Sequence, residues 1–314
     1  MNFKKRVLKN KNNKFLYYIR AILRELMPGW WFRRQLNRIL TKDWEGQSDY
    51  IRQRVDYYNK LERETPLSSK ASAIANYRIP KKIRVYYFDS IEYLRFFDPQ
   101  LKFELIPGDV THVPPEPALL KSRPVQGDNS NSVVLKLDKA RHFNFIKDDI
   151  PFVQKKDLLV GRSGFNQSHR RRFFDRYQDH QLCDLKKAIR SADEEFLSIE
   201  QHLHYKFILA LEGNDVATNL KWIMSSNSIA VMPRPTYETW FMEGVLIPDY
   251  HYICIADDYS DLEEKLQYYI MHQEAAEAIV ENAHQYVAQF KDKAREDAIS
   301  LLVLQKYFDK TNLR

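Results

Sequence analysis

The sequence is poor in cysteine and has no long apolar run. Only Cys183 and Cys254 occur in 314 residues, which is too few for a disulfide framework. No charged and then apolar secretory leader opens the sequence, so we expect a reducing, intracellular compartment. No stretch approaches the roughly 18 consecutive apolar residues that a membrane-spanning helix requires. We therefore expect a cytoplasmic protein that does not cross a bilayer but can lie on its surface.

Common metal and nucleotide motifs are also missing. The sequence contains no Gly-x-Gly-x-x-Gly and no Gly-x-x-x-x-Gly-Lys, which disfavours dinucleotide dehydrogenases and P-loop enzymes. It has no Asp-x-Asp triplet, and its nine histidines show no recognisable ligand spacing. We expect no metal and no cofactor, and we expect cationic side chains and helix dipoles to hold any phosphorylated ligand.

Positive charge is concentrated at the start of the chain. The net charge is +7, but residues 1–40 hold eleven Lys and Arg against Glu25 alone, so this segment carries +10 and the other 274 residues sum to −3. That balance argues against a surface built for nucleic acid. Apolar residues are interleaved with the basic ones, which is typical of a helix on an anionic membrane surface. An ordinary docking helix with a solvated basic face is the alternative.

Hydrophobic periodicity divides the chain into four parts. Residues 1–78 are predicted to be a basic helical region, and residues 79–155 an α/β domain with strands at 83–88, 103–106 and 133–137. Residues 156–292 form the third part, and residues 293–314 a C-terminal helix that can pack back on the first domain.

The third part alternates short apolar strands with amphipathic segments, as parallel βαβ units do. Helices are expected from near His169, through Trp222, from Thr236, and after a capping box at residues 260–263. The predicted strands are 158–160, 205–211, 229–232 and 252–256. This pattern favours a doubly wound sheet, in which ligands bind beyond the carboxyl ends of the strands.

The first strand-to-helix turn is Gly161-Arg162-Ser163-Gly164, and Arg170-Arg171-Arg172 follows at the start of a predicted helix. Backbone N–H groups and planar guanidinium groups at this place suit a diphosphate. A solvated charge run is the alternative.

Two further turns follow the next strands. In one, Gly213 permits close backbone approach, Ala217 and Thr218 leave space, and Lys221 supplies a mobile charge. An ordinary glycine turn with an Asp or Asn cap is the alternative. The other, residues 233–238, combines a rigid loop with a ring and a carboxylate that can stack on a base or bond a sugar.

Asp109 follows a predicted strand of the earlier α/β domain, where it can act as a general base. An Asp after Gly is also common in plain turns. Basic side chains that suit a phosphorylated or acidic acceptor follow it: Lys121, Arg123, Arg141 and His142.

Together these residues resemble glycosyltransferase family 90, the capsule-associated and lipopolysaccharide-modifying proteins related to protein O-glucosyltransferases. The resemblance is closest to the bacterial lipopolysaccharide-type members and covers about residues 80–290. It implies the GT-B architecture, in which two Rossmann-like domains face a cleft. It also implies a UDP-sugar bound mainly by the C-terminal domain, and inversion at the anomeric carbon without metal. The segments that carry it are 107–110, 121–124, 161–172, 205–222, 237–240 and 248–252.

The resemblance implies roles for individual residues as well. Asp109 looks like the general base. Ser163 departs from a family glycine, and Phe165 and Asn219 stand where eukaryotic members carry arginine; Lys221 and the Arg170 to Arg172 cluster are the expected replacements. The implied donor contacts are Arg162, Ser163, Gly164, Arg170, Glu212, Gly213, Asp215, Ala217, Thr218, Asn219, Lys221, Pro233, Tyr237 and Glu238. The acceptor-side residues are Lys121, Arg123, Asn129, Arg141 and His142.

We therefore predict an inverting, metal-independent hexosyl- or pentosyltransferase. It would move a glucose- or xylose-type sugar from UDP to a hydroxyl of lipopolysaccharide, lipooligosaccharide or another surface glycan. Residues 1–40 would hold it at the inner face of the cytoplasmic membrane, and no nucleic acid partner is expected. The main alternative is a non-catalytic membrane-surface scaffold, and the third is an enzyme acting on nucleic acid. The transferred sugar, the acceptor and the oligomeric state stay open.

Overall fold

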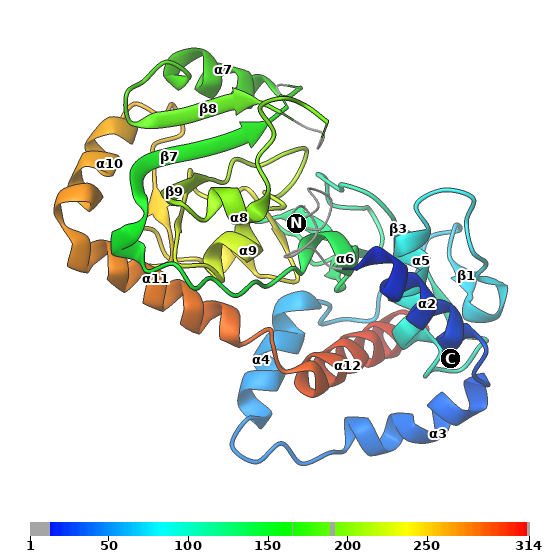
Figure 1. Cartoon of the computed structure of the whole chain (residues 1–314). Coiled ribbons are helices and arrows are strands. Elements are labelled where there is room, and N and C mark those ends of the chain that lie inside the picture. Colours follow the sequence, from blue (N-terminus) through cyan, green and yellow to red (C-terminus); the bar gives the residue numbers. More distant parts are fainter. Residues whose placement is uncertain (1–12, 165, 189–191, 313–314) are drawn as a thin grey trace. The chain divides into compact units, whose positions relative to one another are not determined.

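The computed structural model describes residues 13–164, 166–188 and 192–312. Phe165 and all the basic residues before Lys14 therefore lie outside the described residues. The chain divides into two compact units, which are described separately (Figure 1). Unit 1 contains Ala140–Pro235 and Gly244–Gln289, and unit 2 contains Lys14–Lys139, Thr236–Glu243 and Phe290–Arg314. The predicted domains are contiguous in sequence, whereas these units are interleaved.

Unit 1 is built on a sheet of five parallel strands in the order β12-β10-β9-β7-β8. This is a doubly wound order in which the chain direction across the sheet reverses between β7 and β9. The strands are β7 (Lys156–Ser163), β8 (Cys183–Lys187), β9 (Tyr205–Leu209), β10 (Ile229–Met232) and β12 (Ile253–Cys254). The predicted doubly wound sheet of parallel strands is confirmed.

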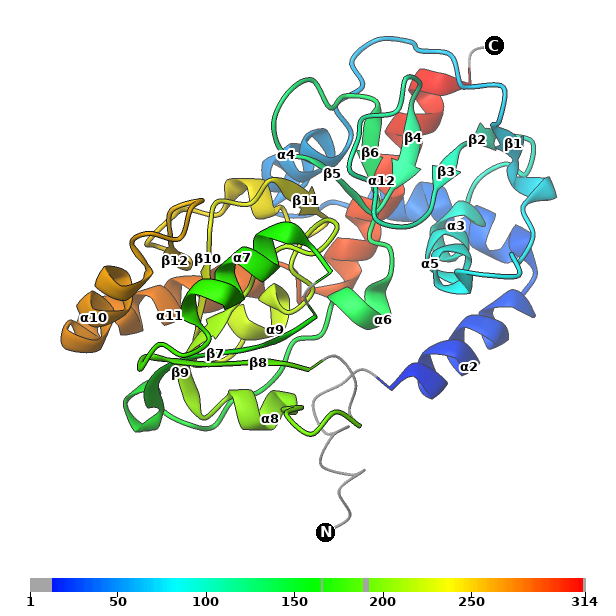
Figure 2. The same cartoon turned by 90° about the horizontal axis from the view of Figure 1, so that it is seen from above.

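Helices cover both faces of this sheet, and Figure 2 shows α7 and α8 on opposite sides of the strands. Phe173 and Phe174 of α7 are fully buried in a core that includes Leu159 and Phe207 of the sheet. The helices of unit 1 are α6 (Lys139–His142), α7 (Ser168–Tyr177), α8 (Ile199–His202), α9 (Leu220–Met224), α10 (Leu262–Met271) and α11 (Gln273–Ala288). The first residue of α6 is assigned to unit 2. Short 3-10 turns lie at η2 (Phe152–Gln154) and η3 (Glu243–Val245).

Two predictions for residues 156–292 are wrong. The expected helix from Thr236 is the strand β11 (Tyr237–Thr239), because it pairs antiparallel with β5 (Ser122–Pro124) of unit 2. The expected capping box is absent: Asp261 precedes α10 without a side-chain capping bond, and its Oδ1 accepts the backbone N–H of Ala256 at 2.8 Å instead.

Unit 2 combines helices with a three-stranded parallel sheet in the order β3-β4-β6. The sheet strands are β3 (Leu105–Ile106), β4 (Ala118–Leu120) and β6 (Ser132–Val134), and β1 (Ser72–Ala73) pairs separately with β2 (Lys102–Phe103). The helices are α2 (Lys14–Glu25), α3 (Gly29–Leu40), α4 (Ser48–Tyr58), α5 (Arg84–Leu94) and α12 (Lys293–Thr311), with the 3-10 turn η1 (Ile74–Asn76).

The predicted strand at residues 83–88 is wrong, because this run lies in helix α5. Ile83 has a positive φ of 56°, and Tyr86, Tyr87 and Phe88 are all buried in the helix that follows. A short run of apolar residues is compatible with a strand or with a helix buried on all sides, and periodicity alone does not separate the two.

The C-terminal helix α12 is an integral part of unit 2. Its Glu296 is buried and accepts from Arg54 of α4 at 3.0 Å and from the indole N–H of Trp240 at 2.6 Å. Tyr58 stacks on Trp240 with ring centroids 3.8 Å apart. The chain therefore returns twice to complete this unit, at residues 236–243 and at α12. Within the described ranges, no helix is both long and apolar enough to span a membrane.

Candidate donor and acceptor sites

Arg170 lies at the switch point of the unit 1 sheet, in the first turn of α7. Its guanidinium donates to the carbonyls of Glu212 and Leu211, both at 2.8 Å, and to Ser163 Oγ at 3.0 Å. Ser163 ends β7, and residues 211–212 follow β9. The structure thus brings Ser163, Arg170 and the backbone of Glu212 together at the carboxyl ends of the two strands where ligands bind in this fold.

The partners that the structure gives Arg170 are all neutral. None of the described carboxylates forms an ion pair with it. Burial, followed by the positive charge of Arg141, lowers the pKa of Arg170. The exposed Arg141, predicted on the acceptor side, is therefore close enough to repel Arg170 electrostatically. A bound anion would stabilise two like charges in this arrangement.

Sequence reasoning missed two residues that belong to this cluster. His169 Nε2 lies 2.9 Å from the Glu212 carbonyl, and Gln167 donates to Asn214 Oδ1 at 3.0 Å. Both residues lie at the start of the predicted helix, and that position could have indicated that they belong to the cluster. Gly213 completes the loop, with its N–H donating to the Asp215 carbonyl at 2.9 Å. A Cβ on Gly213 would lie 3.5 Å from the Arg170 guanidinium, so this loop and α7 are in close contact.

Arg162 is directed elsewhere. It lies inside β7 rather than in a turn, and consecutive side chains of a strand point to opposite faces, so Arg162 and Ser163 diverge. The Arg162 guanidinium pairs with Asp184 Oδ1 at 2.7 Å and donates to the Asp184 carbonyl at 2.7 Å. Burial raises the pKa of Asp184, but hydrogen bonds from Tyr205 and Arg162 outweigh it and leave that pKa below its usual value. The charge of Arg162 is thus neutralised within the fold.

The loop after β9 is largely buried. Asp215 and Ala217 are buried and Thr218 is half-buried. Asn219 does not cap α9 with its side chain; it donates to the Leu209 carbonyl at 2.9 Å. The prediction that Lys221 is a mobile charge is wrong, because α9 packs on β10 and α11 and the Lys221 side chain is fully buried.

The remaining residues predicted to contact the donor are divided between the two units. Gly164 and Pro233 are half-buried at the carboxyl ends of β7 and β10 in unit 1. Tyr237 and Glu238 belong to unit 2. Glu238 lies opposite Arg123 in the β11–β5 register and accepts from Arg123 Nε at 2.7 Å. A predicted donor contact and a predicted acceptor contact thus form one buried ion pair.

Asp109 of unit 2 follows β3, directly after Gly108, whose φ of +104° favours glycine. The Asp109 carboxylate accepts from Lys121 Nζ at 2.6 Å; the lysine is buried, while the carboxylate side chain is 28% exposed. Because β3 and β4 are parallel neighbours, the residues that follow them meet at one sheet edge. A half-exposed carboxylate held by a buried ammonium can accept a proton from a substrate hydroxyl.

Two other acceptor-side predictions fall in the interior. Asn129 donates to the Pro124 carbonyl at 2.8 Å and accepts from Lys60 at 2.8 Å, so it braces the loop after β5. His142 is buried in α6 of unit 1.

No group of three or more His, Cys, Asp or Glu side chains that could hold a metal ion occurs in the part of the chain that the structure describes. His202 is a buried core residue: burial lowers its pKa to about 4, and its Nδ1 lies 2.8 Å from the Ser198 carbonyl.

Comparison with known proteins defines the class, and the chain is a glycosyltransferase. The model of the family described as "Glycosyl transferase family 90" matches residues 154–307. The O-glucosyltransferase LpsA of Dichelobacter nodosus is 40% identical over 304 residues, which cover 94% of this chain and 95% of that protein. The chain belongs to glycosyltransferase family 90, and the predicted resemblance is confirmed. The family match covers the Arg170 cluster and α12 as far as Tyr307, whereas Asp109 lies before it.

Proposed function

We propose that this protein transfers a glucose- or xylose-type sugar from a UDP-sugar to a hydroxyl of lipopolysaccharide, lipooligosaccharide or another surface glycan. Inversion, metal independence, a GT-B arrangement of the two units and a peripheral place at the inner face of the cytoplasmic membrane are parts of this proposal. Family membership and the similarity to the O-glucosyltransferase LpsA support the transfer of a sugar.

The observation that carries the donor side is the Arg170 cluster. Arg170 uses three of its five N–H donors on neutral acceptors, and the charge of Arg141 acts on it. The N-terminus of α7 adds backbone N–H groups and the positive end of a helix dipole. These groups would bind the diphosphate and stabilise the negative charge that develops on UDP as it departs.

Asp109 is the proposed general base. Its carboxylate would take the proton of the acceptor hydroxyl while that oxygen attacks the anomeric carbon from the face opposite UDP. The bond to the UDP oxygen breaks, UDP leaves with the bonding electrons, and the configuration at the anomeric carbon inverts. Lys121 would act as a positioning residue that orients the carboxylate.

Titration calorimetry of the full chain with UDP, UDP-glucose and UDP-xylose tests the donor side. Each titration is done in the presence of a chelator and again with added divalent cations. We expect binding in both series and release of UDP when lipopolysaccharide is supplied as acceptor. Failure of all three ligands to bind would overturn the proposal, and binding only with the cation would overturn metal independence.

A further inference from the structure

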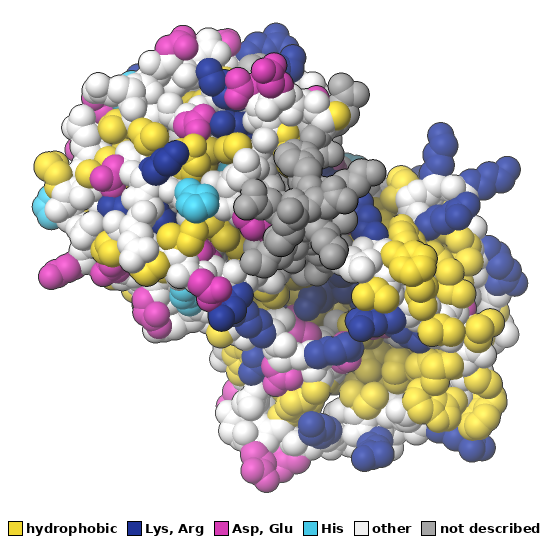
Figure 3. Space-filling view, in the orientation of Figure 1, with side chains coloured by type: hydrophobic (Ala, Val, Ile, Leu, Met, Phe, Trp, Pro, Cys, Tyr) yellow, Lys and Arg dark blue, Asp and Glu magenta, His cyan; other side chains and the backbone are white. Residues whose placement is uncertain are grey.

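Helices α2 and α3 of unit 2 present a broad exposed apolar surface. We name it the α2–α3 face; it includes Phe15, Ile22, Leu23, Leu26, Trp30 and Trp31. Phe15 and Leu26 are 72% and 76% exposed, and a contiguous surface of such apolar side chains is typical of an interaction site. Figure 3 shows hydrophobic side chains gathered over these helices, with Lys and Arg around them.

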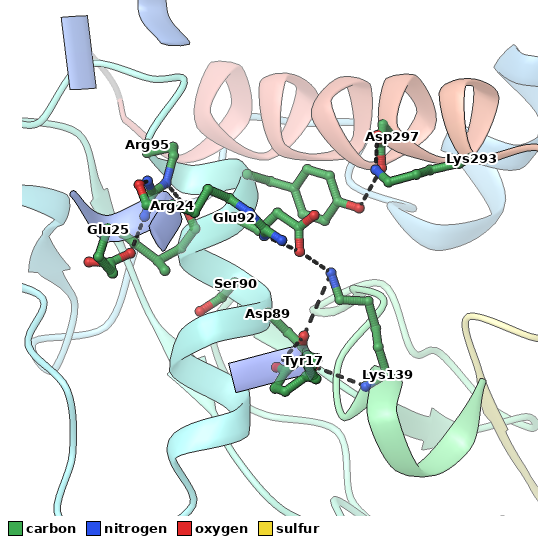
Figure 4. A network of polar contacts seen from close by, with 12 residues as sticks. Tyr17, Arg24, Glu25, Asp89, Ser90, Glu92, Arg95, Lys139, Lys293 and Asp297 are labelled. Carbon is green, nitrogen blue, oxygen red and sulfur yellow. Dashed lines mark hydrogen bonds and ion pairs between the residues drawn. The ribbon is translucent and has the colours of Figure 1, made fainter. Parts of the chain in front are cut away.

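The opposite stripe of α2 attaches it to unit 2. Tyr17, Ala21 and Arg24 lie on this inner stripe by helical spacing, whereas Phe15, Ile22 and Leu26 lie on the outer one. Polar contacts hold the inner stripe to α5 (Figure 4): Tyr17 donates to Asp89 at 2.7 Å, and Arg24 pairs with Glu92 at 2.6 Å.

Further groups strengthen this attachment. Glu25 pairs with Arg95, and Lys139 pairs with Glu92 at 2.5 Å. Burial raises the pKa of Glu92, but Lys139 and Arg24 outweigh it and lower that pKa to about 2. These contacts dock the inner side of α2, whereas the side chains of the outer apolar stripe are exposed. One side of α2 is thus docked, as the docking alternative predicts, and the other side is exposed, as the membrane interpretation requires.

A second basic segment, residues 78–84, joins this face. Arg78, Lys81, Lys82 and Arg84 are exposed there beside Ile79 and Ile83. The segment leads into α5, which runs along α2: Tyr17 donates to the Val85 carbonyl at 3.4 Å, and the rings of Tyr18 and Phe88 lie 5.8 Å apart. Exposed basic residues of α2 and α3 include Arg20, Arg33 and Arg34. The fold places the four basic residues of segment 78–84 beside them.

We propose that the α2–α3 face binds an anionic bilayer, with its apolar side chains at the boundary of headgroups and acyl chains. Exposed apolar residues supply insertion, tryptophans favour the interface, and the flanking cations favour anionic lipid. A free anion would account for the charge but not for the apolar surface. This inference rests on the membrane location in the proposed function, and it identifies the surface of the protein that would bind the membrane.

Flotation of the full chain with vesicles tests this. We expect it to float with phosphatidylcholine mixed with phosphatidylglycerol, and far less with phosphatidylcholine alone. Ile22→Glu with Leu26→Glu should abolish flotation. The control is Met271→Glu in α10 of unit 1, an apolar residue that is likewise 72% exposed, and it should float like the unchanged chain. Arg33→Gln with Arg34→Gln should weaken binding to the mixed vesicles about 25-fold.

Three outcomes would overturn the inference: flotation of the double Glu variant like the unchanged chain, equal binding to both vesicle types, or a dimer in solution that Ile22→Glu with Leu26→Glu dissociates. The last would assign the face to a second copy of the chain. UDP-glucose binding is measured on the same proteins without vesicles. Loss of flotation with intact UDP-glucose binding concerns the membrane face alone, and absence of UDP-glucose binding with intact flotation concerns the transferase proposal alone.

Discussion

Two buried arginines of unit 2 and Arg170 of unit 1 are held in different ways. In unit 2, Arg54 and Arg123 are fully buried and each meets a buried carboxylate, from Glu296 and Glu238. In unit 1, Arg170 is only half-buried and donates to carbonyls and a hydroxyl. The first arrangement cancels the charge inside the protein. The second arrangement orients the guanidinium and leaves its charge for a ligand. The hydrogen-bond partners of an arginine therefore indicate its role better than the residue type does.

Removing a carboxylate from unit 2 should give the largest effect. Glu296→Ala would leave Arg54 and Lys136 without their buried counter-ion and Trp240 without its acceptor. We expect a loss of about 3–5 kcal/mol in the free energy of unfolding, measured by urea denaturation. Arg295→Ala, at the preceding position of α12, is the comparison variant. If Glu296→Ala were as stable as the unchanged chain, the Glu296–Arg54 ion pair would have no structural role.

Asp109 lies between the two cases, since it has a cationic partner but stays partly exposed. Asp109→Asn should lower kcat about 100-fold or more, because the amide cannot take a proton. Binding of UDP-glucose, followed by calorimetry, should change little. A variant that turns over normally would remove Asp109 from the mechanism, and a variant that loses donor binding would reassign it.

Arg170→Ala tests the charge left for a ligand. We expect the Kd for UDP to rise about 10-fold to 100-fold, the usual worth of charge-assisted hydrogen bonds. Arg176→Ala should leave Kd unchanged, since Arg176 lies in the last turn of α7, at the opposite end of the helix from Arg170. Arg162→Ala should mainly lower thermal stability because Asp184 loses its ion-pair partner. If the Arg162 variant loses UDP binding and the Arg170 variant does not, the assignment is reversed.

Glu92 gives the smallest expected effect, and it concerns pH. Its folded pKa of about 2 lies below the ordinary 4.5, so its contribution is full above the unfolded value and is lost as pH falls from about 4.5 through about 2. Denaturation measured at a series of pH values should show a shallower acid slope for Glu92→Gln. An unchanged slope would mean that Arg24 and Lys139 do not stabilise the ionised carboxylate.

Local patterns in the sequence predicted a good part of the donor unit. The strand β10 and the start of α7 follow from periodicity and helix-start residues, because these signals act over a few neighbouring positions. The apolar run at 83–88 was misassigned because a buried helix and a buried strand carry the same residues. Lys221 was placed at the surface because burial of a lysine depends on packing that its neighbours do not reveal.

The sequence by itself determined the class of fold, the family and the residue types available for chemistry. Tertiary structure alone decided which cations meet carboxylates. Arg123 finds Glu238 across 115 positions and Arg170 reaches the Glu212 carbonyl across 42. Such pairings depend on how strands and helices pack, and packing is a property of the whole unit. The same reason explains why one side of α2 is docked while the other stays exposed.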